Sequence, residues 1–269
     1  MYPLAINKEQ NYENFIAICP YRICGYKNVY NRCDDLETFE PIEGQNVKCF
    51  SCGKNFRING DEVNAPYEYL YYDCDEFIKQ KRYMNCIINF AQSIEMFLSH
   101  CIRVKLLWLP YQKGIITLDK VNSISENLSS KIKELHIAFH YLKNIFFDVY
   151  LNQKTFCSKC KILDYIDKLE LHDSICSNLA KCRLEEPPDC DTQKYPDSEL
   201  VSLFMNLKRT KVNTLRNDVV HRGYRPSIKE VKKYKKETAK VIFGLGGKLK
   251  IKWEDYYLNC DLLIERQNS

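Results

Sequence analysis

Four cysteines near the N-terminus have the residue type and the spacing of metal ligands. They form two pairs, Cys19-x4-Cys24 and Cys49-x2-Cys52, with 24 residues between the pairs. A tetrahedral zinc ion is commonly held by four thiolates from two such short loops. The chain has 14 cysteines, and its start lacks the pattern of a signal peptide, so reduced thiols are favoured over disulfides. We therefore predict a structural zinc ion bound by these four residues.

Glycines and aromatic residues around the pairs support this prediction. Gly25 and Gly53 directly follow the second cysteine of each pair, where a glycine lets the backbone turn around the metal. The stretch from about residue 15 to 58 resembles a zinc ribbon, with one more spacer residue in the first pair than the commonest ribbon knuckle has. We expect Phe50 and Phe56 to supply its small core.

Other cysteines and histidines offer weaker alternatives for metal binding. Cys33 competes as a ligand in the first region. A second cluster starts at Cys157-x2-Cys160 but lacks paired knuckles and flanking glycines; its further members are Cys176, Cys182 and Cys190. His136 and His140 could join that cluster, but they lie beside an apolar seam and are better interpreted as half-buried polar groups.

A basic segment contains the second candidate site. Residues 208–240 hold 12 Lys or Arg against three Asp or Glu, a net charge of +9, whereas the whole chain carries +5. Arg216, Asn217 and His221 lie within this segment. The ordinary pKa of histidine, about 6.5, suits proton transfer near neutral pH.

Residues 215–223 resemble the motif of the HEPN superfamily. That motif is an arginine followed by four to six residues and a histidine, often with a polar residue directly after the arginine. Arg216, Asn217 and His221 match it position by position. Residues 90–98 also look like the first bundle helix of that family, so the resemblance covers about residues 76–245. It implies a homodimer with the active cleft between two protomers.

The resemblance implies metal-independent RNA cleavage, without a catalytic metal. The 2′-hydroxyl would attack the adjacent phosphate and leave a 2′,3′-cyclic phosphate and a 5′-hydroxyl. His221 would transfer protons, Arg216 would stabilise the phosphorane-like transition state, and Asn217 would orient the phosphate or His221. We expect further contacts to the RNA backbone from Arg222, Arg225, Lys229, Lys232 and Lys233. Such a nuclease would be of the toxin or antiviral-defence kind, with RNA, a second copy of the chain and an antitoxin or regulatory protein as partners.

Three other interpretations stay open. A histidine near a helix C-terminus, followed by arginine and glycine, is also an ordinary helix cap. A HEPN-like bundle can also be a non-catalytic scaffold, for example for a nucleotidyltransferase, and His221 would then be dispensable. A zinc-ribbon regulator that binds nucleic acid would place the function in residues 15–58.

Arg216 and His221 are expected to lie about 140° apart around one helix. The two side chains can therefore act together only if the long arginine side chain wraps around the helix, or if the same helix of a second protomer meets the first.

The composition predicts a mainly all-α fold. Glycine makes up only 9 of 269 residues, which favours long helices over tight turns. We predict a zinc-ribbon β module over residues 1–70, a HEPN-like antiparallel bundle of four to five helices over 75–247, and a tail over 248–269 that is ambiguous between strand and helix. No window approaches 18 apolar residues, so we expect a cytoplasmic protein.

The first part of the bundle shows apolar residues at helical spacing. The spacing predicts one helix from residue 76 to about 108, ended by Pro110. A second helix is predicted through residues 128–149, with Ser123 and Glu126 as a capping box in front of it. A weaker third helix spans residues 162–179, and three prolines make 185–196 an exposed loop.

The second part of the bundle carries the HEPN-like motif. Asp197 or Ser198 is predicted to cap a fourth helix that runs through Val219 and stops at Gly223. Ser227 and Glu230 form the capping box of a fifth helix. That helix is predicted to end at Gly244, Gly246 and Gly247.

Overall fold

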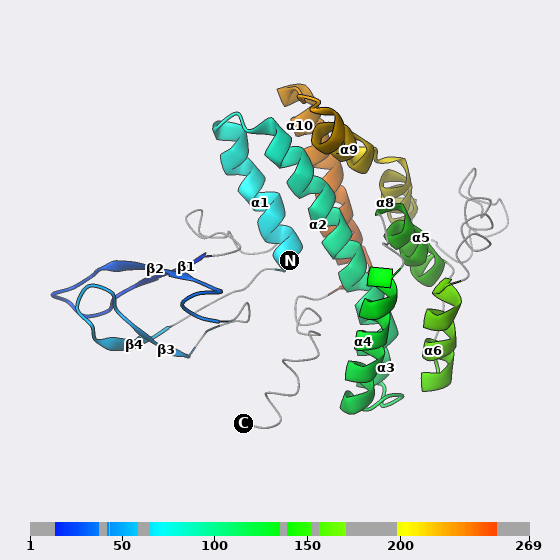
Figure 1. Ribbon diagram of the computed structural model, residues 1–269, viewed down its shortest axis with the longest axis horizontal. Helices are drawn as coiled ribbons and strands as arrows, with labels where there is room; N and C mark the ends of the chain where they lie inside the picture. The colour runs from blue at the N-terminus through cyan, green and yellow to red at the C-terminus, as the bar shows by residue number, and fades with distance from the viewer. Residues whose placement is uncertain are drawn as a thin grey trace.

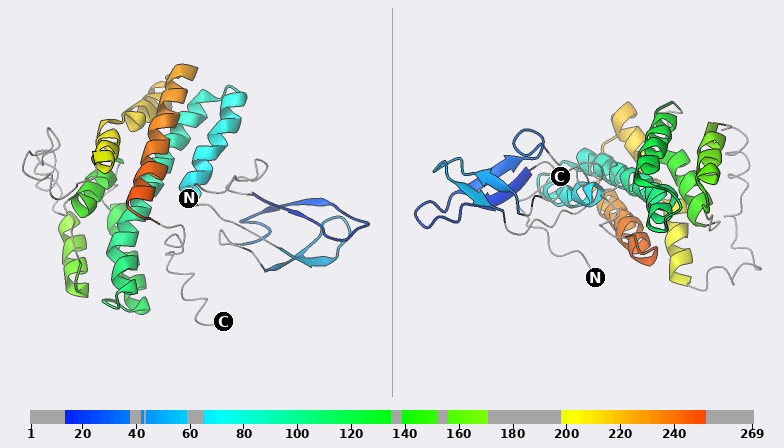
Figure 2. Two further views of the ribbon diagram at one scale, coloured as in Figure 1. Left: turned by 180° about the vertical axis from the view of Figure 1, so that it is seen from behind. Right: turned by 90° about the horizontal axis from the view of Figure 1, so that it is seen from below.

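The computed structural model describes residues 14–37, 42, 44–58, 65–134, 139–151, 156–170 and 198–251. Two small β-hairpins precede a set of helices (Figure 1). The hairpins lie to one side of the helices in the other two views as well (Figure 2). The predicted fold class, mainly helical behind a cysteine-bearing β module, is confirmed.

Each hairpin joins two short antiparallel strands. Strand β1 (Asn14–Ile18) pairs with β2 (Lys27–Asn31), and β3 (Asn46–Lys48) pairs with β4 (Asn55–Arg57). Alternate residues of each strand point inward, as the period of two requires. The inward residues, with neighbours from the loops, form a small separate core: Phe15, Cys19, Tyr30, Ile42, Val47, Cys49, Phe56 and Ile58.

Phe50 lies outside this core, contrary to the prediction, whereas Phe56 is buried as expected. The side chain of Phe50 is 57% exposed because it follows Cys49 in the turn between β3 and β4. Its ring lies 4.9 Å from the ring of Tyr30. Phe15 and Tyr30, on the first hairpin, fill the interior instead.

The predicted helix from residue 76 to 108 is in fact two helices. Helix α1 (Pro66–Lys79) starts ten residues earlier than predicted, with Pro66 in its first turn, where a proline needs no hydrogen-bonding N–H. Lys81 has a φ of 58°, a left-handed conformation that interrupts the helix. The helical part therefore begins at Pro66, inside the range that the sequence assigned to the ribbon.

The second helix continues past its predicted end. Helix α2 (Tyr83–Arg103) runs on through the π-helical segment η1 (Val104–Trp108) into α3 (Leu109–Gln112). Pro110 lies in the first turn of α3 rather than after the last one. The chain then turns at Gly114, whose φ is 67°.

The middle helices also differ from the prediction at their ends. Helix α4 (Leu118–Glu134) starts before Ser123, so the predicted capping box is wrong, and the hydroxyl of Ser123 donates to the carbonyl of Lys120 at 3.2 Å. Helix α5 (Phe139–Tyr150) follows. Helix α6 (Lys159–Asp167) is capped by Ser158 and ends in the 3₁₀ turn η2 (Lys168–Glu170). The rest of the predicted third helix and the predicted loop at 185–196 lie outside the described residues.

The predicted fourth helix is divided into α8 (Ser198–Arg209) and α9 (Val212–Arg222). The side chain of Thr210 explains the break. Its hydroxyl donates to the Glu237 carboxylate at 2.8 Å and accepts from the backbone N–H of Val212 at 3.4 Å. Gly223 ends α9 as predicted, with a φ of 65° in the left-handed region.

The last described helix begins as predicted and ends later. Helix α10 (Ile228–Ala239) opens with the capping box of Ser227 and Glu230. It continues through the π-helical segment η3 (Lys240–Leu245) into α11 (Gly246–Lys248), so its glycines do not terminate it. Two of them, Gly244 and Gly246, allow close packing instead. A Cβ on Gly244 would lie 2.8 Å from Cδ2 of Leu203, and one on Gly246 would lie 3.4 Å from the ring of Phe97.

Helix α2 is the centre of the helical core. Its apolar stripe is buried along its length, with Ile87, Phe90, Ile94, Phe97, Leu98 and Cys101 at 0% exposure. It packs against α1, α5, α9 and α10. In the part of the chain that the structure describes, no helix combines the length and apolarity needed to span a membrane.

Candidate functional site

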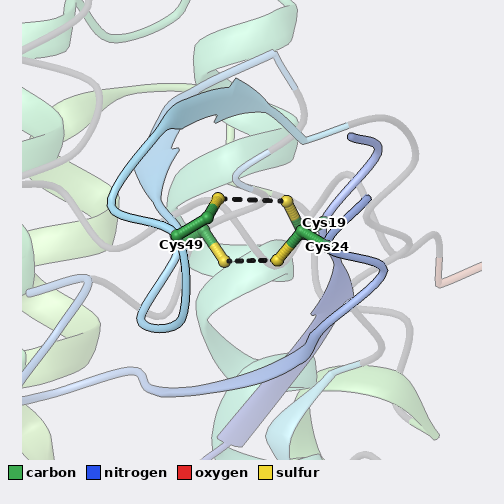
Figure 3. A group of neighbouring side chains, drawn as sticks. Cys19, Cys24 and Cys49 are labelled. Atoms are coloured by element: carbon green, nitrogen blue, oxygen red, sulfur yellow. Dashed lines mark hydrogen bonds between the residues drawn. The ribbon is translucent and has the colours of Figure 1, made fainter. Parts of the chain in front are cut away.

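The four predicted cysteine ligands come together between the two hairpins. The Sγ atoms of Cys19 and Cys52 are 3.8 Å apart, and those of Cys24 and Cys49 are 3.7 Å apart (Figure 3). All four sulfurs lie within 4.8 Å of one another. Zinc–sulfur bonds of about 2.3 Å in a tetrahedron separate neighbouring sulfurs by about 3.8 Å. The donor set therefore fits a tetrahedral structural metal ion such as zinc.

Tight turns hold the ligands in each knuckle. Gly25 and Gly53 take left-handed conformations, with φ of 54° and 70°. The N–H of Gly25 donates to the carbonyl of Tyr21 at 3.1 Å, and that of Gly53 donates to the carbonyl of Cys49 at 2.9 Å. Each glycine thus closes a turn that points the two cysteines of its pair toward the same metal position, as the sequence indicated.

The Cys49 thiol is prepared for metal binding by hydrogen bonds. Burial raises its pKa, but the backbone N–H groups of Cys52 and Ser51 and the side chain of Asn28 outweigh this effect and lower the pKa to about 6. Burial raises the pKa of Cys19 to about 12. Because thiolates are the metal-binding form, Cys49 needs less help than Cys19 to lose its proton.

Asn28 is a structural residue of this centre that the sequence analysis missed. Its side chain has 0% exposure. Its amide nitrogen donates to the carbonyls of Ala17 at 3.4 Å and Tyr26 at 3.2 Å, and its oxygen accepts from the N–H of Phe50 at 2.8 Å. Asn28 therefore ties the first hairpin to the second knuckle. The available signal was a polar residue at an inward position of β2, in phase with Tyr30.

The alternative metal ligands do not join this group. Cys33, Cys157 and Cys160 are exposed, and His140 is exposed on α5. Among the described residues, only the four knuckle cysteines form a cluster able to hold a metal ion. The remaining members of the second cluster, Cys176, Cys182 and Cys190, lie outside the described residues, as does His136.

The three motif residues of the basic segment lie on α9. Val212 and Val219 are buried on the side of this helix that packs against α2. Asn217 and His221 are exposed and stand one turn apart. The guanidinium of Arg216 donates to Oδ1 of Asn217 at 3.0 Å. The structure thus brings Arg216 and Asn217 together, and within the described residues the side chain of His221 contacts neither of them by a hydrogen bond.

Glu95 on α2 is a further charged residue at this site. It is half-buried, and burial raises the pKa of its carboxyl, while the positive charge of Arg216 partly opposes that rise. The carboxyl is therefore near enough to Arg216, the residue that contacts Asn217, for its pKa to be affected by that positive charge. The sequence does not reveal this role, because Glu95 is a single acidic residue beside the apolar stripe of α2.

The end of α9 is closed without the imidazole of His221. The carbonyl of Asp218 accepts from the N–H groups of Gly223 and of Tyr224, the latter at 3.1 Å. The carboxylate of Asp218 pairs with the guanidinium of Arg222 at 2.9 Å. These backbone bonds form the turn at Gly223, and the side chain of His221 is exposed.

The predicted RNA-contacting cations are all exposed. Arg222 keeps 81% of its side chain exposed despite its ion pair with Asp218. The others lie just before α10 or on it: Arg225, Lys229, Lys232 and Lys233. By contrast, Lys235 is paired with Asp75 of α1 and lies over the ring of Tyr71, so it belongs to the packing of the bundle.

Neither a scan of protein-family models nor searches of curated proteins and of solved structures found a match to this chain. The interpretation of the function therefore rests on the geometry of this chain alone. It defines a four-cysteine cluster on two antiparallel hairpins, similar to a zinc ribbon, followed by a helical domain. The assignment to the HEPN superfamily stays a prediction.

Proposed function

We propose that this chain is a metal-independent endoribonuclease of the HEPN type, with a zinc ribbon as a structural attachment. The observation that supports it is the exposed polar group on α9. Asn217 and His221 share one face of the helix, Arg216 is hydrogen-bonded to Asn217, and a row of exposed cations follows. A polyanion that approaches this face meets positive charge and a proton-transfer group together.

Each residue has a distinct role in the proposed reaction. The 2′-hydroxyl of the RNA loses a proton and attacks the adjacent phosphorus, and the 5′-oxygen of the next nucleotide leaves with a proton. His221 moves these protons, because its exposed imidazole can accept and donate a proton. Arg216 stabilises the charge on the phosphorane-like transition state, and Asn217 holds the guanidinium in place.

The cap interpretation of His221 explains less of this geometry. In that interpretation His221 only complements the dipole at the end of α9, where Gly223 takes the left-handed conformation of a helix cap, and Arg216 and Asn217 have no part. The exposed imidazole of His221 is also accessible to a substrate. Its distance around the helix from Arg216 favours an active site completed by α9 of a second protomer, so we expect a homodimer.

Single substitutions on α9 test the proposal. Arg216→Ala and His221→Ala should each lower RNA cleavage by a factor on the order of 10² or more, because each removes a charge stabiliser or a proton-transfer group. Helical circular dichroism should be unchanged, because both side chains lie outside the core. His140→Ala, which removes an exposed histidine from α5, is the matched control and should cleave like the wild type. A folded His221→Ala variant with full activity would refute the nuclease and favour a non-catalytic scaffold.

Metal content tests the structural part of the proposal. Protein that was never exposed to a chelator should contain about one zinc per chain, because a closed thiolate site contributes folding free energy. Cys52→Ser should lose most of this zinc, whereas Cys33→Ser, at an exposed cysteine outside the cluster, should keep it. Less than half an equivalent of zinc in the wild type would contradict the site.

A further inference from the structure

The two cysteine knuckles expose an unusual share of large apolar side chains. Ile23 is completely exposed, Phe50 is 57% exposed, and Tyr26 is 47% exposed. Single exposed apolar residues are ordinary, but several on one small unit indicate a contact surface. The hairpin core does not need them, since Phe15, Tyr30 and Phe56 already fill it.

The same knuckles are uniformly basic. Residues 14–31 and 44–58 contain no Asp or Glu, and their cations are Arg22, Lys27, Lys48, Lys54 and Arg57. Four thiolates around a divalent ion add a net charge of about −2, which these cations exceed. Among the residues of this unit that the structure describes, acidic side chains appear only after β2, at 34, 35 and 37, at the end of the first hairpin opposite its knuckle. In the sequence, Glu40 and Glu43 follow in the same connection and Glu13 precedes β1.

Hydrogen bonds hold the backbones of the two knuckles near one another. The Asn28 amide contacts the carbonyl of Tyr26 and the N–H of Phe50, so the two backbones lie on either side of one amide group. The hydroxyl of Tyr21 donates to the carbonyl of Asn55 at 2.9 Å, and the ammonium of Lys54 lies 4.8 Å from the Tyr21 ring. A ring of the first knuckle and a cation of the second, Tyr21 and Lys54, are therefore in contact.

We propose that this knuckle surface, formed by Tyr21, Arg22, Ile23, Tyr26, Phe50 and Lys54, binds single-stranded RNA. Unpaired bases stack on exposed rings, and nearby cations contact the phosphates between them. The cores of protein interfaces are depleted of lysine, so interleaved lysines favour a polyanion over a protein partner. The choice of RNA over DNA rests on the proposed function, in which the bound strand is the one that α9 cuts.

Binding by the full-length, zinc-loaded chain tests this surface. The probe is a fluorescein-labelled single-stranded RNA without stable secondary structure, and all proteins carry His221→Ala so that the probe stays intact. Tyr26→Ala and Phe50→Ala should each weaken binding by about tenfold, the typical effect of losing one stacked base. Phe50→Tyr keeps a ring and should retain the affinity. Met84→Ala, an exposed apolar residue on α2, should change nothing.

Salt dependence tests the cations separately. Arg22→Gln combined with Lys54→Gln should reduce the slope of log affinity against log salt by about one to two. Lys161→Gln, at an exposed position on α6, should leave the slope unchanged. Zinc content measured on every variant shows whether the ribbon is intact, and Phe50→Tyr keeps the ring test usable if Phe50→Ala loses the metal.

The outcomes separate this inference from the nuclease proposal. Ring-dependent binding of RNA by a wild-type chain that cuts no RNA would support the knuckle surface and refute the nuclease. Unchanged affinity in both ring variants would overturn the knuckle surface, as would tighter binding to single-stranded DNA or duplex RNA of the same length. A protein partner lost from the ring variants while RNA binding stays constant would also overturn it.

Discussion

Glu68 is the carboxyl of α1 whose titration should be visible in the stability of the protein. Burial raises its pKa from 4.5 to about 7, so the folded chain favours the neutral form. The unfolded chain ionises near 4.5, and the contribution of the protonated Glu68 is therefore complete at low pH and lost as pH rises toward 7. Glu68→Gln removes this loss. At pH 8 the variant should be more stable than the wild type by about 1 to 3 kcal/mol, and at pH 5 the difference should be small.

Denaturant unfolding at the two pH values measures this effect. Glu76→Gln is the matched control on the same helix, because hydrogen bonds from Lys79 and Gln80 lower the pKa of Glu76. That control should bring no gain at pH 8. A Glu68→Gln variant with the same advantage over wild type at both pH values would contradict the assignment.

Some residues of the candidate sites could be predicted from the sequence, and others could not. Cys19, Cys24, Cys49 and Cys52 could be identified because metal ligands follow a local spacing with glycines behind it. Asn28 and Glu95 could not, because each acts through a contact between distant segments. A single polar residue in an apolar pattern does not indicate which distant segment it contacts.

At the scale of the elements, apolar spacing located the helices but not their ends. The breaks at Lys81 and Thr210 come from a left-handed backbone and from a side-chain bond to Glu237, and neither leaves a periodic signal. The capping box at Ser227 was identified correctly because both of its bonds are local. Glycine is ambiguous in the same way, since Gly223 ends a helix whereas Gly244 and Gly246 lie inside one.

The helical glycines make a testable pair. Gly247 has no atom within 4 Å of an added Cβ, and its φ is not positive, so Gly247→Ala should stabilise the chain by about 0.5 to 1 kcal/mol. In Gly244→Ala the new methyl would lie 2.8 Å from the buried Leu203, so the same gain is offset by repacking. Thermal unfolding should place Gly244→Ala below Gly247→Ala by about 1 kcal/mol or more. Equal stabilities would show that the glycines do not serve close packing.

At the scale of the whole molecule, the described residues form two separate hydrophobic cores, one in the hairpins and one among the helices. The hairpins have eight buried core residues and a four-cysteine centre, and the helices share one large core around α2. Low glycine content and the clustered cysteines were enough to predict this division. How the helices meet was not predictable, because it depends on small-residue contacts such as Gly246 against Phe97.

The products of cleavage test the central claim most directly. Three oligonucleotides of one sequence, all-ribo, all-deoxy, and all-ribo with a 2′-O-methyl group at the cleaved position, are incubated briefly with the wild-type chain in EDTA. The account predicts that only the unmodified RNA is cut, leaving a 2′,3′-cyclic phosphate and a 5′-hydroxyl, and that His221→Ala forms these ends at least about 100 times more slowly. Cleavage of the all-deoxy strand at a similar rate, or products with 5′-phosphate ends, would contradict it.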